Sequence, residues 1–171
     1  MHLNPYGEYA VELAADLANR RPRTIDELVA RCIEAGVVVD FPVFEDDLGD
    51  VLAVLDRWVV IVDAAHEQDR AEQVNLLLAK ASAYPRLTNH AGDGWHLHYR
   101  DDQRSLAGVL EALIAVGTAL HLVGRGMSRL GRCAVEECTV IYADTSRNGR
   151  QRYCSPRCAN RDAVRRHRSR C

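Results

Sequence analysis

Residues 133–138 (CAVEEC) and residues 154–158 (CSPRC) decide the fold of this chain of 171 residues. Two close cysteine pairs separated by fifteen residues suit a tetrahedral zinc site with the ligands Cys133, Cys138, Cys154 and Cys158. A disulfide framework is the alternative, but Cys32 and Cys171 would be left over and no export signal begins the chain. Because four thiolates leave no position open to water, the spacing predicts one structural Zn²⁺ per chain.

The residues between the two pairs carry their own signals. Residues 139–142 (TVIY) have strand character, Asn148-Gly149 is a strong hairpin-turn signal, and residues 151–153 would return toward the second pair. Ser155-Pro156 then supplies a helix cap and a proline at the first helical position, which places Cys158 in the first turn. The order of knuckle, hairpin and helix predicts a treble-clef zinc finger.

The helix that begins at this point is rich in arginine. At about 100° per residue, four arginines share a sector of roughly 80°: Arg157, Arg161, Arg165 and Arg168. Almost no acid is expected to pair with this row, Asp162 excepted. Such a row is typical of a nucleic-acid-binding element, and a solvated basic face is the alternative. Guanine contacts are predicted for Arg157 and Arg161, and an adenine contact or a capping role for Asn160. Phosphate contacts are predicted for Arg165, Arg166 and Arg168 on the helix and for Arg147, Arg150 and Arg152 before it.

Charge is distributed unevenly along the chain. Residues 1–126 hold 11 Arg and Lys against 20 Asp and Glu, whereas residues 127–171 hold 11 Arg against 4 acids. The overall net charge of −2 conceals this contrast. We therefore expect an acidic regulatory or dimerisation domain over residues 1–126 and a basic zinc finger over residues 127–171, which would meet different partners.

Residues 1–126 read as a helix-rich domain with a small β-hairpin, so the fold class is α+β. Helical periodicity predicts helices over residues 6–20, 24–36, 46–65 and 68–83, and a long apolar helix over 106–123. Alternation over residues 86–99 predicts the hairpin. Its His90, His96 and His98 could be metal ligands, although a half-exposed strand shows the same alternation.

The apolar segment at residues 106–123 is long enough to span a bilayer. Its many small residues and its flanking helix start and stop signals favour a core helix instead, so no membrane association is expected. Cys32 falls within an amphipathic pattern and is interpreted as a core residue. The chain has no nucleophile elbow, phosphate loop or paired helical histidines, and no enzyme activity is expected.

The C-terminal residues resemble the bacterial CGNR zinc-finger family. The resemblance is carried by Arg132-Cys133 and by residues 142–150 (YADTSRNGR), 152–155 (RYCS), 158–161 (CANR) and 164–168 (VRRHR). Alanine replaces the glycine of the family tetrapeptide, and Tyr153 stands where the family usually has tryptophan. Residues 1–126 are similar in layout to the ABATE domain, which precedes this finger in stress-induced transcriptional regulators.

The resemblance implies a cytoplasmic bacterial transcriptional regulator that binds duplex DNA through the finger. A homodimer is expected through the N-terminal domain, by way of the helix at residues 106–123 or the Trp58 helix, and a small-molecule effector is left open. The alternative is a zinc-dependent module that binds a protein or RNA. HNH-type nucleases also use treble clefs, but they need a histidine base near the metal, and His167 lies at the wrong end of the helix.

Overall fold

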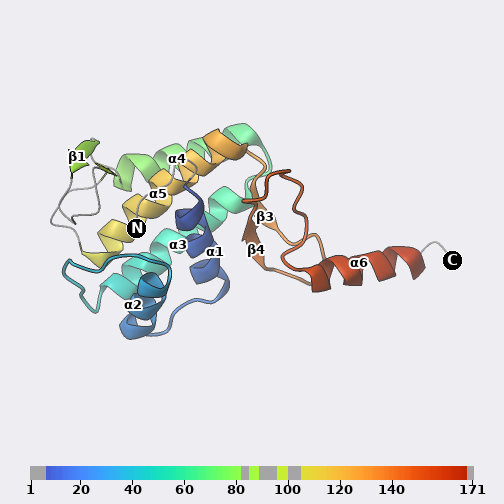
Figure 1. Ribbon diagram of the computed structural model, residues 1–171, viewed down its shortest axis with the longest axis horizontal. Helices are drawn as coiled ribbons and strands as arrows, with labels where there is room; N and C mark the ends of the chain where they lie inside the picture. The colour runs from blue at the N-terminus through green and yellow to red at the C-terminus, as the bar shows by residue number, and fades with distance from the viewer. Residues whose placement is uncertain (1–6, 82–84, 89–95, 100–104, 169–171) are drawn as a thin grey trace.

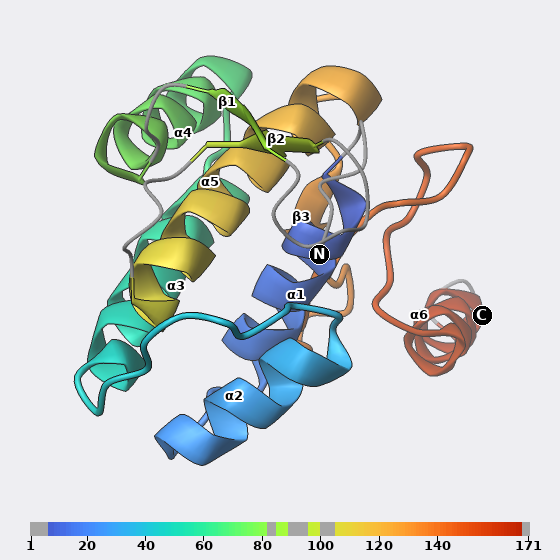
Figure 2. The ribbon, with the colours of Figure 1, turned by 60° about the vertical axis from the view of Figure 1, so that its left-hand side comes forward.

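The computed structural model describes residues 7–81, 85–88, 96–99 and 105–168. Helices α1 to α5 form a helical body, and α6 projects away from it (Figures 1 and 2). The helices of these residues are α1 (Glu8–Asn19), α2 (Ile25–Glu34), α3 (Asp47–Asp63), α4 (Glu67–Ala81), α5 (Leu106–Arg125) and α6 (Pro156–Arg168). The strands are β1 (Arg86–Thr88), β2 (His96–His98), β3 (Leu130–Arg132) and β4 (Ile141–Ala143). The predicted helix-rich chain with a small antiparallel hairpin is thereby confirmed.

The core of the helical body is built around α5. Leu106, Leu110 and Ile114 of this helix are fully buried, as is Trp58 of α3, whose indole N–H donates to Thr118 Oγ1 at 2.9 Å. Within the described residues, α5 is the helix long and apolar enough to cross a membrane, and 67% of its apolar window is buried inside the protein. Its apolar side chains therefore serve the core, where Cys32 is also fully buried.

The predicted hairpin of the N-terminal part is present as β1 and β2, which pair antiparallel with Leu87 opposite Leu97. His90 lies outside the described residues, as do the side chains of His96 and His98. A metal site on these histidines stays a prediction.

The hairpin predicted between residues 139–142 and 151–153 is wrong. Strand β4 pairs instead with β3, on the other side of the first knuckle (residues 133–138), with Arg132 opposite Ile141. The physical reason lies in Asp144, whose carboxylate accepts hydrogen bonds from the backbone N–H groups of Ser146 and Gln151. These bonds curl the chain after β4 into a loop, so Gly149 adopts its left-handed φ of 60° within that loop and not between paired strands.

The β3–β4 pair is attached to the helical body. Leu130 and Ile141 are 2% and 5% exposed and belong to the same hydrophobic core as the helices. Asn19 at the end of α1 pairs with the backbone of Ile141, donating to its carbonyl and accepting from its N–H at 2.8 Å each. Arg132 forms two hydrogen bonds with Asp63 of α3 at 2.6 and 2.9 Å. The main core therefore crosses the boundary expected at residue 126.

Candidate metal centre

The four predicted cysteine ligands lie together. Cys133 and Cys138 bound the first knuckle, Cys154 precedes α6, and Cys158 lies in the first turn of α6. Their Sγ atoms all fall within 4.8 Å of one another. Three of the Sγ–Sγ distances are 3.6, 3.7 and 3.9 Å. A tetrahedron with Zn–S bonds of about 2.3 Å has edges of about 3.8 Å. The donor set and its geometry fit a closed, structural zinc site.

Local hydrogen bonds hold the knuckle in this arrangement. Cys133 N–H donates to the Val140 carbonyl at 2.9 Å, and Cys138 N–H donates to the Val135 carbonyl at 2.8 Å. Val135 is 2% exposed and packs against the cysteines in a small cluster separate from the main core. At the second pair, Ser155 Oγ accepts from the Cys158 N–H at 3.3 Å and so caps the start of α6. Both ends of the site are thus fixed by the backbone.

The thiols differ in how easily they ionise. Burial raises the pKa of Cys154 to about 12. Burial also acts to raise the pKa of Cys133, but backbone hydrogen bonds from Cys154 and Val135 outweigh it and bring that pKa to about 7. Cys133 therefore ionises before Cys154, and zinc binding must displace the proton of Cys154.

Asp162 connects α6 to the segment that carries Cys154. Its side chain is 7% exposed and accepts a hydrogen bond from the Tyr153 hydroxyl at 2.7 Å. It also pairs with Arg165 at 3.0 Å and with Arg166 at 2.9 Å. The Tyr153 hydrogen bond, followed by the two arginines, lowers the pKa of Asp162. An ionised Asp162 fixes the direction in which α6 leaves the metal centre.

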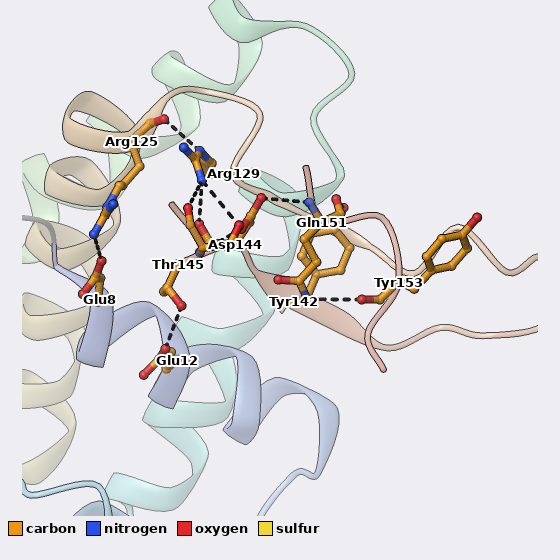
Figure 3. A network of polar contacts seen from close by, with 10 residues as sticks. Glu8, Glu12, Arg125, Arg129, Tyr142, Asp144, Thr145, Gln151 and Tyr153 are labelled. Atoms are coloured by element: carbon orange, nitrogen blue, oxygen red, sulfur yellow. Dashed lines mark hydrogen bonds and ion pairs between the residues drawn. The ribbon is translucent and has the colours of Figure 1, made fainter. Parts of the chain in front are cut away.

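A second polar network shapes the arginine loop, which we define as residues 144–152 (Figure 3). Asp144 is 2% exposed and accepts from Ser146 N–H at 2.9 Å, Ser146 Oγ at 2.5 Å and Gln151 N–H at 3.0 Å. Arg129 lies inside the loop, 3.6 Å from the Asp144 carboxylate, and donates to the Ser146 carbonyl at 2.7 Å. Burial acts against ionisation of Asp144, but the hydrogen bonds from Ser146 and Gln151 outweigh it and lower its pKa.

Glycine is favoured at one point of this loop, because Gly149 has a left-handed φ of 60°. A Cβ on Gly149 would lie 2.4 Å from Cζ of Arg129, so a larger residue would displace the guanidinium that fills the loop. The network therefore holds Arg147 and Arg150, both exposed, on a loop of defined shape.

All nine residues predicted to contact nucleic acid are exposed: Arg147, Arg150, Arg152, Arg157, Asn160, Arg161, Arg165, Arg166 and Arg168. Six of them lie on α6 and three on the arginine loop. The expectation that Asp162 is the one acid near the arginine row is wrong, because the first knuckle supplies two more. Glu137 lies 3.8 Å from Arg161, and Glu136 lies 3.3 Å from Arg165.

No local sequence pattern marks Glu136 and Glu137 as partners of α6. Glu137 precedes its partner Arg161 by 24 residues and Glu136 precedes Arg165 by 29, and only closure of the metal site brings the first knuckle beside the helix.

Comparison with protein families agrees with the cysteine cluster. The model of the CGNR zinc finger matches residues 129–171. This match begins at β3 and includes all four cysteines, the arginine loop and α6, but it does not extend into the helical body. Among curated proteins, none matches the chain. The C-terminal part is thus similar to a CGNR zinc finger, and together with the clustered cysteines this supports a structural zinc ion.

Proposed function

We propose that the protein is a transcriptional regulator that binds duplex DNA through α6 and the arginine loop. One observation carries the proposal: α6 projects from the helical body (Figure 1), has one of the four clustered cysteines in its first turn, and carries exposed arginines along its length. The match to the CGNR zinc finger and the order of knuckle, loop and helix support a treble-clef element in this role.

The dimensions of α6 suit the major groove. An α-helix with its side chains is about 10–12 Å across, and the major groove of B-DNA is about 12 Å wide. The helix has 13 residues and so a length of about 20 Å. On this proposal, Arg157 and Arg161 near its start would read guanine edges, and Arg168 near its end would contact a phosphate.

The helical body would supply regulation. On this proposal it is an ABATE-like domain that forms a homodimer in the bacterial cytoplasm and gives the two fingers a palindromic site. The faces of α3 and α5 that carry Trp58 and Ile114 are buried in the core, so the dimer would use other surfaces.

An RNA- or protein-binding module is the second candidate, because the same exposed arginines would suit an acidic partner. Double-stranded RNA suits α6 less well, since side chains cannot read its deep and narrow major groove.

Binding of the zinc-loaded full chain to labelled DNA and RNA duplexes, measured by fluorescence anisotropy at two salt concentrations, tests the proposal. A duplex selected by the protein from a random pool serves as the specific site. Arg168→Ala should weaken binding to all duplexes alike and lower the salt slope by about one unit. Arg157→Ala should reduce the preference for the selected site, where a bidentate contact is worth about 1–3 kcal/mol.

Lys80→Ala, which removes a positive charge from α4, is the matched control and should leave binding unchanged. Failure of the zinc-loaded protein to bind duplex DNA at low salt would overturn the proposal, and equal or tighter binding of RNA would favour the second candidate.

A further inference from the structure

The two glutamates of the first knuckle occupy part of the proposed DNA-binding surface. Glu136 lies 3.3 Å from Arg165, and Glu137 lies 3.8 Å from Arg161, so each acid pairs with an arginine in the middle of α6. The two glutamate side chains are 83% and 66% exposed, and their arginine partners are about half exposed.

Folding does not require these two pairs. Exposed ion pairs contribute little to stability, and Arg165 is already held by the more deeply buried Asp162 at 3.0 Å. The glutamates also contribute nothing to the metal site, whose four ligands are cysteines. Their position must therefore be explained by the surface on which they lie.

Carboxylates and phosphates compete for the same guanidinium groups. An arginine binds either anion through the same N–H donors, and a carboxylate held beside it also repels an approaching phosphate. Within the described part of the chain, no carboxylate lies within ion-pair distance of Arg147, Arg150, Arg157 or Arg168. The acids of the knuckle therefore mask the middle of the arginine row and leave its two ends and the arginine loop open.

We infer that Glu136 and Glu137 act as an internal competitor for DNA phosphates and thereby set the specificity of the finger. This inference rests on the proposed function. Binding that uses phosphate attraction alone must displace the glutamates from Arg161 and Arg165, which weakens binding to DNA of arbitrary sequence. Binding to a selected duplex draws part of its free energy from base contacts of Arg157, which these glutamates do not pair with, and so depends less on Arg161 and Arg165. The glutamates therefore weaken non-specific binding more than specific binding and increase the difference between the two.

The test compares the full zinc-loaded chain with the double variant Glu136→Gln/Glu137→Gln on a scrambled duplex and on the selected duplex. Because each released arginine gains a phosphate, we expect the salt slope on scrambled DNA to steepen by about 1–2 units. Affinity for the scrambled duplex should rise about 5- to 20-fold at low salt, affinity for the selected duplex should rise less, and the ratio between them should fall.

The matched control is Glu67→Gln/Glu72→Gln, which makes the same change in net charge on α4. The DNA affinity of this control variant should stay within twofold of the wild-type affinity. Its salt slope should stay within a few tenths of a unit of the wild-type slope. Zinc content and circular dichroism verify that both double variants are folded.

The outcomes separate the inference from the function on which it rests. If the wild type binds duplex DNA and the knuckle variant matches the control variant or binds more weakly, the inference is overturned while the proposed function stands. If neither protein binds at any salt concentration, the proposed function fails, and the inference fails with it.

Discussion

Removal of zinc should loosen the metal cluster and α6 while β3 and β4 stay attached to the helical body. The perturbation is a strong chelator, or Cys154→Ser, which removes one of the four thiolates. The metal cluster has little else to hold it, because its buried residues are Cys133, Val135 and Cys158. Burial of one valine contributes about 1.5–3 kcal/mol, against about 10–16 kcal/mol for zinc in a structural cysteine site. An unsupported helix of 13 residues is marginal by itself.

The β3–β4 pair has support that does not depend on the metal. Burial of Leu130 and Ile141 contributes about 1.5–3 kcal/mol each, and the two hydrogen bonds of Asn19 contribute about 0.5–1.5 kcal/mol each. Together these contacts provide about 4–9 kcal/mol. These contacts offset the entropy cost of ordering the two strands without any contribution from the metal.

Amide hydrogen exchange distinguishes the two parts of the chain. After zinc removal, the Ala159 N–H, which bonds the Ser155 carbonyl, should exchange freely, whereas the Ile141 N–H, which bonds Asn19, should stay protected. Asn19→Ala with zinc bound is the converse control and should expose the Ile141 N–H alone. Equal loss of protection at Ile141 and Ala159 on chelation would refute the reasoning, because the whole segment from residue 127 would then unfold as one unit.

Three further substitutions test the polar contacts. Asp144→Asn should cost about 2–3 kcal/mol in urea denaturation, because an amide N–H would face the donors of the arginine loop. Asp144→Asn should also weaken DNA binding, although it removes a negative charge. Unchanged stability of this variant would contradict the role given to Asp144. For Asp16, burial opposes ionisation, but hydrogen bonds from Arg20 and Arg31 lower its pKa below the ordinary 3.8. Its stabilisation is therefore present above pH 3.8 and lost as the pH falls through the folded-state value. Asp16→Asn should thus destabilise by at most about 1 kcal/mol at pH 7, since the side chain is partly exposed, and by less near pH 2. An equal effect at both pH values, followed by tryptophan fluorescence, would count against this role of Asp16. Asp63→Asn should weaken the attachment of β3 by about 1 kcal/mol, measured as a lower urea midpoint. Because Arg132 has lost its partner in that variant, adding Arg132→Ala to it should not lower the midpoint further.

The metal centre and most helices could be predicted because their signals are local. Cysteine spacing alone indicates the ligand set, and Thr24 does begin a helix, accepting a hydrogen bond from Glu27 N–H at 3.1 Å. A threonine followed three residues later by a glutamate is typical of a capping box, but here the Glu27 carboxylate accepts from the Arg23 N–H and not from that of Thr24.

The strand pairing could not be predicted in the same way. The Asn148-Gly149 signal does mark a turn, but the partner of β4 is a strand of three residues that no periodicity reveals. Asn19 and Ile141 are separated by 122 residues, and a side chain that pairs with a backbone leaves no pattern in the sequence. The contacts of Glu136 and Glu137 likewise exist only once the metal ligands have met.

The projection of α6 gives the molecule a large electric dipole. The helical body and α6 lie toward opposite ends of the molecule (Figure 1). Residues 1–126 carry 9 more acidic than basic residues, and residues 127–171 carry 7 more basic than acidic residues. In the field of a polyanion this separation produces a torque that turns α6 forward and the body backward before any contact forms. At low ionic strength, collisions in which α6 meets the polyanion first then become a larger fraction of all collisions. That advantage disappears as the screening length falls below the length of the helix, about 20 Å.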